Sequence, residues 1–193
     1  MSQLLGGLGS VVAALLVGGL IAVPVAASAP PPPKKKPGVL HVYDGGSLFT
    51  EGAIDRSKVA MGKMMFEHET VLTVDTHATV PKDKTLPDER GERARFFESW
   101  AKSAASGDRA KGVYVLVCRS PGYVQVIADK ATRDRGFTAA NEQRLRDLFT
   151  QAFKDAAQAK KDGKADEDVL RIRDKALSNA AEYVSGILKG TVK

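Results

Sequence analysis

Residues 112–128 decide the fold of this 193-residue chain, and they read GVYVLVCRSPGYVQVIA. The run from Gly112 to Cys118 is continuously apolar, which is typical of a β-strand buried on both faces. Residues 120–123 predict a type II turn, because the proline pre-sets φ at the second position and the glycine supplies a positive φ at the third. Residues 123–128 return as the antiparallel partner. The sequence therefore predicts a β-hairpin inside a sheet.

Strand and helix patterns alternate on the N-terminal side of this hairpin. Strands are predicted at residues 39–43 and 70–76, which are rich in apolar and β-branched side chains. Between them, Thr50 is placed to cap a helix that runs to about Glu67. Residues 78–92 contain two prolines, a glycine and mixed charges, so they are expected to form a long loop.

The predicted helices carry apolar faces that suit packing on a sheet. Phe97 and Trp100 lie one turn apart on a short helix before the hairpin. After the hairpin, Thr138 caps one helix and a last helix covers about residues 169–188. This order of elements predicts a single α/β domain over residues 39–190, with a mixed β-sheet, a central hairpin and helices on both faces, an α/β/α sandwich.

Residues 4–27 are almost entirely aliphatic or glycine, and no charged residue precedes Lys34. We expect residues 1–27 to be a cleaved signal peptide, because small residues precede Ser28 where a signal peptidase needs them. The alternatives are an uncleaved membrane anchor, which would tether the domain through residues 4–27, and a buried helix of the domain. The sequence thus predicts an exported protein, either periplasmic or otherwise extracytoplasmic, or one anchored in the membrane.

A proline- and lysine-rich segment at residues 28–38 follows. Consecutive prolines favour an extended polyproline helix and adjacent lysines repel one another, so this segment is expected to be a semi-rigid linker. Lys34, Lys35 and Lys36 supply three of the six positive charges in the net charge of +6. The remaining chain is too close to neutral for a surface that neutralises many phosphates, so no nucleic-acid partner is expected.

The overall composition narrows the class of protein. Hydrophobic residues make up 43% of the chain and charged residues 27%, which excludes a wholly disordered chain and a multi-span membrane protein. A stripe of methionines and alanines on the predicted first helix is expected to pack in the core rather than to form a partner-binding groove. Its members are Ala53, Ile54, Ala60, Met61, Met64 and Met65.

No strong catalytic signature is present in the chain. It has no G-x-S-x-G, no phosphate-binding loop of the P-loop type, no H-E-x-x-H and no C-x-x-C pair. The single cysteine, Cys118, cannot form an intramolecular disulfide, and its place in a buried strand favours a structural thiol over a nucleophile. The absence of an evident nucleophile–base pair favours a non-catalytic role.

Two groups of polar residues are candidates for a site. Asp75 and His77 lie two residues apart near the end of a predicted strand, so their side chains share a face at the end where α/β folds place ligands. Asp129 opens the charge-dense loop 129–136. Its carboxylates could hold a hard cation such as Ca²⁺, its arginines could hold phosphate, or the loop could simply be solvated.

The chain resembles the TPM domain family, which includes bacterial envelope proteins and a thylakoid-lumen acid phosphatase. Asp44 matches the early Asp of that family, residues 97–100 match its aromatic–Trp element, and residues 112–128 match its hairpin. The segment from Phe137 to Phe153 matches the helix that follows. The resemblance covers about residues 39–190 and implies an exported module with a membrane or envelope protein partner.

Three functions are consistent with these observations. The first is a non-catalytic envelope module, similar to TPM proteins that assist the assembly or quality control of membrane complexes. The second is a metal-assisted, Ca²⁺-binding, acid phosphatase-like hydrolase that uses Asp44, Asp75 and Asp129 as metal ligands; these carboxylates would have to converge on one ion. The third is a ligand-binding module, which needs a mainly apolar pocket whose lining the sequence does not identify.

Overall fold

The predicted hairpin is present in the computed structural model, which describes residues 34–106 and 111–190. Its strands are β5 (Val113–Ser120) and β6 (Tyr123–Ala128), and they pair in antiparallel fashion. In the turn between them Gly122 has a φ of +85°, as expected, and the Ser120–Pro121 peptide bond is cis. The hairpin prediction is confirmed.

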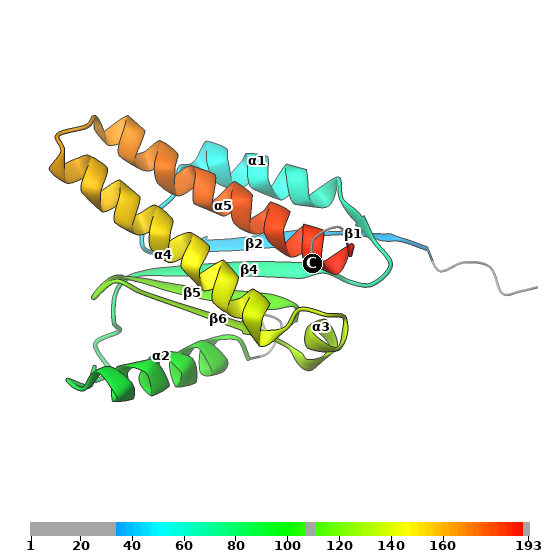
Figure 1. Cartoon of the computed structure of the whole chain (residues 1–193), viewed down its shortest axis with the longest axis horizontal. Helices are drawn as coiled ribbons and strands as arrows, with labels where there is room; N and C mark the ends of the chain where they lie inside the picture. The colour runs from blue at the N-terminus through cyan, green and yellow to red at the C-terminus, as the bar shows by residue number, and fades with distance from the viewer. Residues whose placement is uncertain (1–33, 107–110, 191–193) are drawn as a thin grey trace, which may run out of the picture. The chain divides into compact units, whose positions relative to one another are not determined.

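Four strands form the main sheet in the order β2–β4–β5–β6 (Figure 1). The strands β2 (Val39–Asp44), β4 (Val71–Thr79) and β5 are parallel, whereas β6 is antiparallel, so the sheet is mixed as predicted. Of the hairpin strands, β5 lies inside the sheet and β6 forms one edge. Ile127 lies on this edge strand and is only half-buried.

Side chains of β5 alternate between two apolar layers, which explains its continuously apolar sequence. Val113, Val115 and Val117 belong to one core cluster, while Tyr114, Leu116 and Cys118 belong to the other. None of these six side chains is more than 2% exposed. A strand covered on both faces needs apolar residues at every position, because neither face meets water.

Three helices cover the face of the sheet to which Val115 points: α1 (Glu51–Gly62), α4 (Ala139–Lys161) and α5 (Asp166–Leu188) (Figure 1). The sequence predicted caps for α1 and α4, and the predicted residues, Thr50 and Thr138, are the N-caps of these helices. The Thr50 hydroxyl accepts a hydrogen bond from the Ala53 N–H at 3.2 Å, and the Thr138 N–H donates to the Asn141 side chain at 2.7 Å. Each of these bonds satisfies a polar group at a helix start that has no partner within the helix.

Among the described helices, α2 (Arg90–Ala104) is the one that covers the opposite face (Figure 1). Phe97 is fully buried and Trp100 is 6% exposed, so the predicted packing of both rings over one face of the hairpin is confirmed. The Phe97 and Tyr123 rings stack with their centroids 4.0 Å apart. Helices on both faces of a mixed sheet make the α/β/α sandwich that the sequence predicts.

The first helix is shorter than predicted. It ends at Gly62 instead of about Glu67, because β3 (Met65–Phe66) pairs with β1 (Lys36–Pro37) in a small antiparallel ribbon. This pairing gives the last residues of the predicted linker a place in the fold. It also breaks the predicted methionine stripe: Met61 is fully buried in the core, but Met65 is 46% exposed.

The predicted signal peptide or anchor at residues 1–27 lies outside the described residues. Within residues 34–106 and 111–190, no helix combines the length and the apolar character needed to cross a membrane. A short helix, α3 (Lys130–Asp134), occupies the charge-dense loop after β6.

Candidate functional site

Asp44 holds together the loop that follows β2. Its carboxylate accepts hydrogen bonds from the backbone N–H groups of Leu48, at 3.0 Å, and Phe49, at 2.9 Å. The hydroxyl of Thr76, on the neighbouring strand β4, also donates to it. These bonds satisfy the backbone of a tight loop and give Asp44 a structural role at the carboxyl end of β2.

Asp75 lies on β4, where it pairs with Tyr43 of β2. Its side chain points to the face of the sheet that α2 covers. The Tyr114 hydroxyl donates to its carboxylate at 2.8 Å, and the residue is 4% exposed. His77, two residues further on, places its Nε2 3.3 Å from a carboxylate oxygen of Asp75. The His77 ring in turn packs against Trp100, with centroids 4.8 Å apart.

Asp129 lies at the other end of the sheet. The Ala128–Val113 pairing places it beside the start of β5, where its carboxylate accepts bonds from the N–H of Gly112 at 2.8 Å and of Thr132 at 2.6 Å. Burial by itself would raise the pKa of Asp129, but these hydrogen bonds and the nearby Arg135 outweigh it and lower the pKa below its usual value. Asp129 therefore caps α3 and anchors the start of β5.

The structure does not bring the three predicted metal ligands together. Asp44 and Asp75 lie on the neighbouring strands β2 and β4 but point to opposite faces of the sheet, and Asp129 lies at the end of the sheet where β5 begins. Across residues 34–106 and 111–190, no group of three or more His, Cys, Asp or Glu side chains is arranged to hold a metal ion. A single ion shared by these three carboxylates does not fit this geometry, and the expectation of Ca²⁺ binding rests on the sequence alone.

Cys118 and His77 lie at paired register positions on β5 and β4, a juxtaposition that sequence reasoning missed because 40 residues separate them. The thiol donates a hydrogen bond to the Ser120 carbonyl oxygen at 3.0 Å. Burial raises the pKa of Cys118, and the bond to Ser120 only partly offsets this. Burial therefore favours the protonated form of the thiol, which is the weaker nucleophile.

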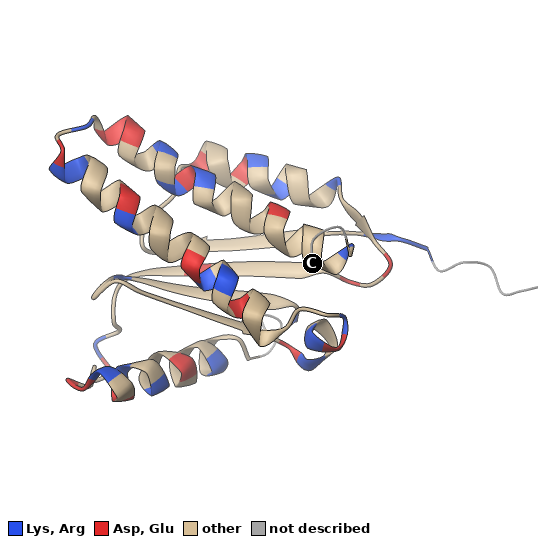
Figure 2. Ribbon diagram, in the orientation of Figure 1, with Lys and Arg blue, Asp and Glu red and all other residues tan. Residues whose placement is uncertain are grey.

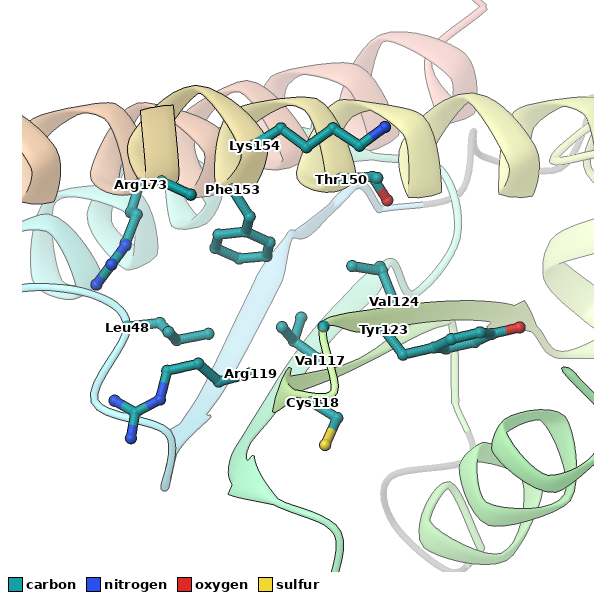
Figure 3. Close-up of a pocket in the computed structure, with 12 residues that line it drawn as sticks. Leu48, Val117, Cys118, Arg119, Tyr123, Val124, Thr150, Phe153, Lys154 and Arg173 are labelled. Carbon is teal, nitrogen blue, oxygen red and sulfur yellow. The ribbon is translucent and has the colours of Figure 1, made fainter. Parts of the chain in front are cut away.

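A cavity of about 310 Å³ opens at the hairpin-turn end of the sheet, between the turn, the loop after β2, and the helices α4 and α5 (Figure 3). Its apolar lining comes from four separate elements and includes Leu48, Val117, Val124 and Phe153. This is the end where the parallel strands β2, β4 and β5 finish, which is where α/β folds usually bind ligands. We refer to it as the turn cavity.

Three basic side chains line the turn cavity: Arg119, Lys154 and Arg173. None of the 12 lining residues is acidic, and no carboxylate of the described residues forms an ion pair with any of the three. Figure 3 shows Arg119 and Arg173 reaching from opposite walls toward the same side, near Leu48, while Lys154 extends along α4. Arg119 is held in place by a hydrogen bond to the Gly46 carbonyl oxygen at 3.2 Å.

No local pattern in the sequence points to the turn cavity. Its lining residues come from four stretches between residues 48 and 173, and none of those stretches contains a recognisable motif. The only local signal was the apolar hairpin itself, which forms part of the cavity wall. Cationic side chains that are distant in sequence gather there only once α4 and α5 lie over the sheet.

Comparisons with known proteins add no assignment. No family model, no curated protein and no solved structure matches the chain. The resemblance to the TPM domain family therefore stays an expectation drawn from residues 39–190.

Proposed function

We propose that this chain is an exported, non-catalytic module that binds a membrane or envelope protein through an anionic group received in the turn cavity. The observation that carries the proposal is the combination of an apolar lining with three basic side chains and no acidic one. Cavities that bind ligands are mostly apolar with a few convergent polar groups, and this cavity has that composition.

The charges of the turn cavity select the chemistry of its ligand. Arg119 and Arg173 can each form charge-assisted hydrogen bonds to a carboxylate or phosphate, and Lys154 adds a third positive charge. The apolar residues Leu48 and Phe153 lie between them and suit an adjoining aliphatic or aromatic group. An acidic residue flanked by apolar residues on a partner protein has both features.

Binding is favoured over catalysis by the kinds of side chain present. General acid–base catalysis needs a group that titrates near the working pH and reaches the substrate. Neither a carboxylate nor an imidazole belongs to the described lining of the cavity, and the side chain of Cys118 points to the opposite face of the sheet. The second candidate, a metal-assisted acid phosphatase-like hydrolase, would need carboxylates that converge, and Asp44, Asp75 and Asp129 do not.

The proposal is tested with a probe that combines an aromatic body and an anionic group, 8-anilinonaphthalene-1-sulfonate, titrated into the purified full chain. We expect Lys154→Gln and Arg173→Gln each to weaken binding about tenfold, as the loss of a charge-assisted contact implies. Lys58→Gln removes an exposed lysine of α1 outside the cavity lining and should leave the affinity unchanged.

Two results would count against this function. If the Lys154 and Arg173 variants bound the probe as tightly as the parent, the turn cavity would not be the binding site. If the purified chain hydrolysed p-nitrophenyl phosphate in a Ca²⁺-dependent manner, and lost that activity in Asp44→Asn, the hydrolase would replace the binding module.

A further inference from the structure

A second basic surface lies at the opposite end of the sheet, where the chain enters the domain. A hollow of about 590 Å³ is lined there by residues of β3, by the segment after α3, and by the end of α5. Its basic members are Lys35, His68, Arg135 and Lys189. We call this surface, together with the exposed Lys34 and Lys36, the basic end of the domain.

The positive charges of the basic end come from segments far apart in the sequence. Figure 2 shows the basic segment that leads into β1 at this end of the domain, close to the end of α5. Lys189 places its ammonium group 5.2 Å from the centroid of the Phe66 ring, which anchors its stem against β3. Arg135 is fixed by hydrogen bonds to the Glu69 carbonyl oxygen at 2.9 Å and the Thr132 hydroxyl at 3.0 Å.

The acidic residues nearby do not cancel these charges. Glu67 itself lines the hollow and Glu69 lies on the same loop. Both are exposed, and Glu69 lies 3.9 Å from Lys111, a further basic residue. The three consecutive lysines 34–36 have no ion pair among the described residues. The basic end therefore carries an excess of positive charge that the domain itself leaves uncompensated.

An exposed apolar side chain lies among these cations. Met65 is 46% exposed on β3, paired with Pro37 of β1. A flexible apolar side chain surrounded by lysine and arginine is the composition with which proteins contact anionic membrane surfaces, since the apolar group enters the interface while the cations meet lipid phosphates.

We propose that the basic end rests on an anionic phospholipid surface and so orients the domain with the turn cavity facing away from the membrane. The short stretch of chain between Lys34 and the apolar N-terminal segment favours a lipid surface over a soluble partner. Six residues, 28–33, separate Lys34 from the apolar segment that ends at Ala27, and six residues extend at most about 20 Å. If residues 4–27 stay uncleaved in a membrane, which is the alternative to a cleaved signal peptide, that membrane is within reach of the lysines, and attraction to anionic lipid acts over about one Debye length.

The two surfaces serve different partners without overlap. The turn cavity lies where β5 ends, and the basic end lies where β5 begins, eight residues away along an extended strand. The lipid proposal stands independently of the function proposed for the turn cavity, because no residue lines both hollows.

Acetylation of lysines, read by mass spectrometry on the full chain, tests the lipid proposal. The chain is reconstituted in vesicles of phosphatidylcholine alone or of phosphatidylcholine mixed with phosphatidylglycerol. We expect Lys36 and Lys189 to be acetylated severalfold more slowly in the anionic vesicles, and high salt to remove this protection. Lys58 on α1, exposed and outside the basic end, serves as the internal control and should react equally in both.

A charge-removing variant sharpens the test. Replacing Lys35 and Lys189 together by Gln should reduce the protection of Lys36, because each basic residue at an anionic surface changes partitioning about fivefold. Equal acetylation of the parent in both kinds of vesicle would overturn the proposal. Equal protection by soluble polyglutamate in neutral vesicles would also overturn it, in favour of an acidic protein at this surface.

Discussion

Removing the Trp100 side chain should destabilise the domain by a large fraction of its total stability. Trp100 is 6% exposed and packs against three other rings: Phe97 at 5.8 Å, Phe96 at 6.1 Å and His77 at 4.8 Å between centroids. Truncation of a buried Trp to Ala typically costs about 3–5 kcal/mol, because the transfer of the side chain and the cavity it leaves both contribute. For a domain of this size the melting temperature should fall by about 10 °C.

The measurement is urea unfolding of Trp100→Ala, followed by circular dichroism because the variant lacks the only tryptophan of the chain. Phe96→Ala is the matched control: it removes an aromatic ring from the same helix at a half-buried position, so its cost should be clearly smaller. A loss below about 1 kcal/mol for Trp100→Ala would show that α2 does not cover the sheet, and the packing described for this face would be wrong.

Two further predictions concern carboxylates that the structure gives a capping role. Asp44→Ala should lower the free energy of unfolding by about 1–3 kcal/mol, because it leaves the N–H groups of Leu48 and Phe49 without an acceptor. Thermal melts with EDTA or with Ca²⁺ should show the same loss of stability. A Ca²⁺-dependent difference would instead assign Asp44 a metal role. Because folding lowers the pKa of Asp129, its stabilisation is present above the unfolded pKa of about 3.9 and is lost as pH falls through the folded pKa. The free energy of unfolding of Asp129→Asn should therefore fall less steeply with decreasing pH than that of the parent. Parallel pH profiles of the two proteins would refute this.

Local features of the sequence were enough to predict several elements of the fold. The Pro-Gly turn and the apolar runs around it specify the hairpin, because turn conformation and side-chain alternation depend on neighbouring residues only. Thr50 and Thr138 were predictable as helix caps for the same reason. The end of α1 at Gly62 was not, because it depends on the pairing of β3 with β1, and these strands are far apart in the chain.

The candidate site, like the fold, was predictable only where neighbouring residues specify the structure. The sequence predicted Asp44, Asp75 and Asp129 near strand ends. Asp44 ends β2 and Asp129 follows β6, but Asp75 is the middle residue of β4, which runs on to Thr79. Whether they converge depends on strand order, strand direction and the face to which each side chain points. The antiparallel direction of β6 carries Asp129 to the far end of the sheet, and register turns Asp44 and Asp75 to opposite faces.

By itself, the sequence determined that the chain forms a mixed α/β sheet around an apolar hairpin, since burial of a continuous apolar strand requires cover on both faces. Only the tertiary structure decided which polar residues share a surface. Arg119 and Arg173 line the same turn cavity because α5 packs on the face of the sheet to which Val117 points, and no local pattern brings together residues 54 positions apart. The physical reason is that backbone propensities act over a few residues, whereas a cavity is formed by packing between elements.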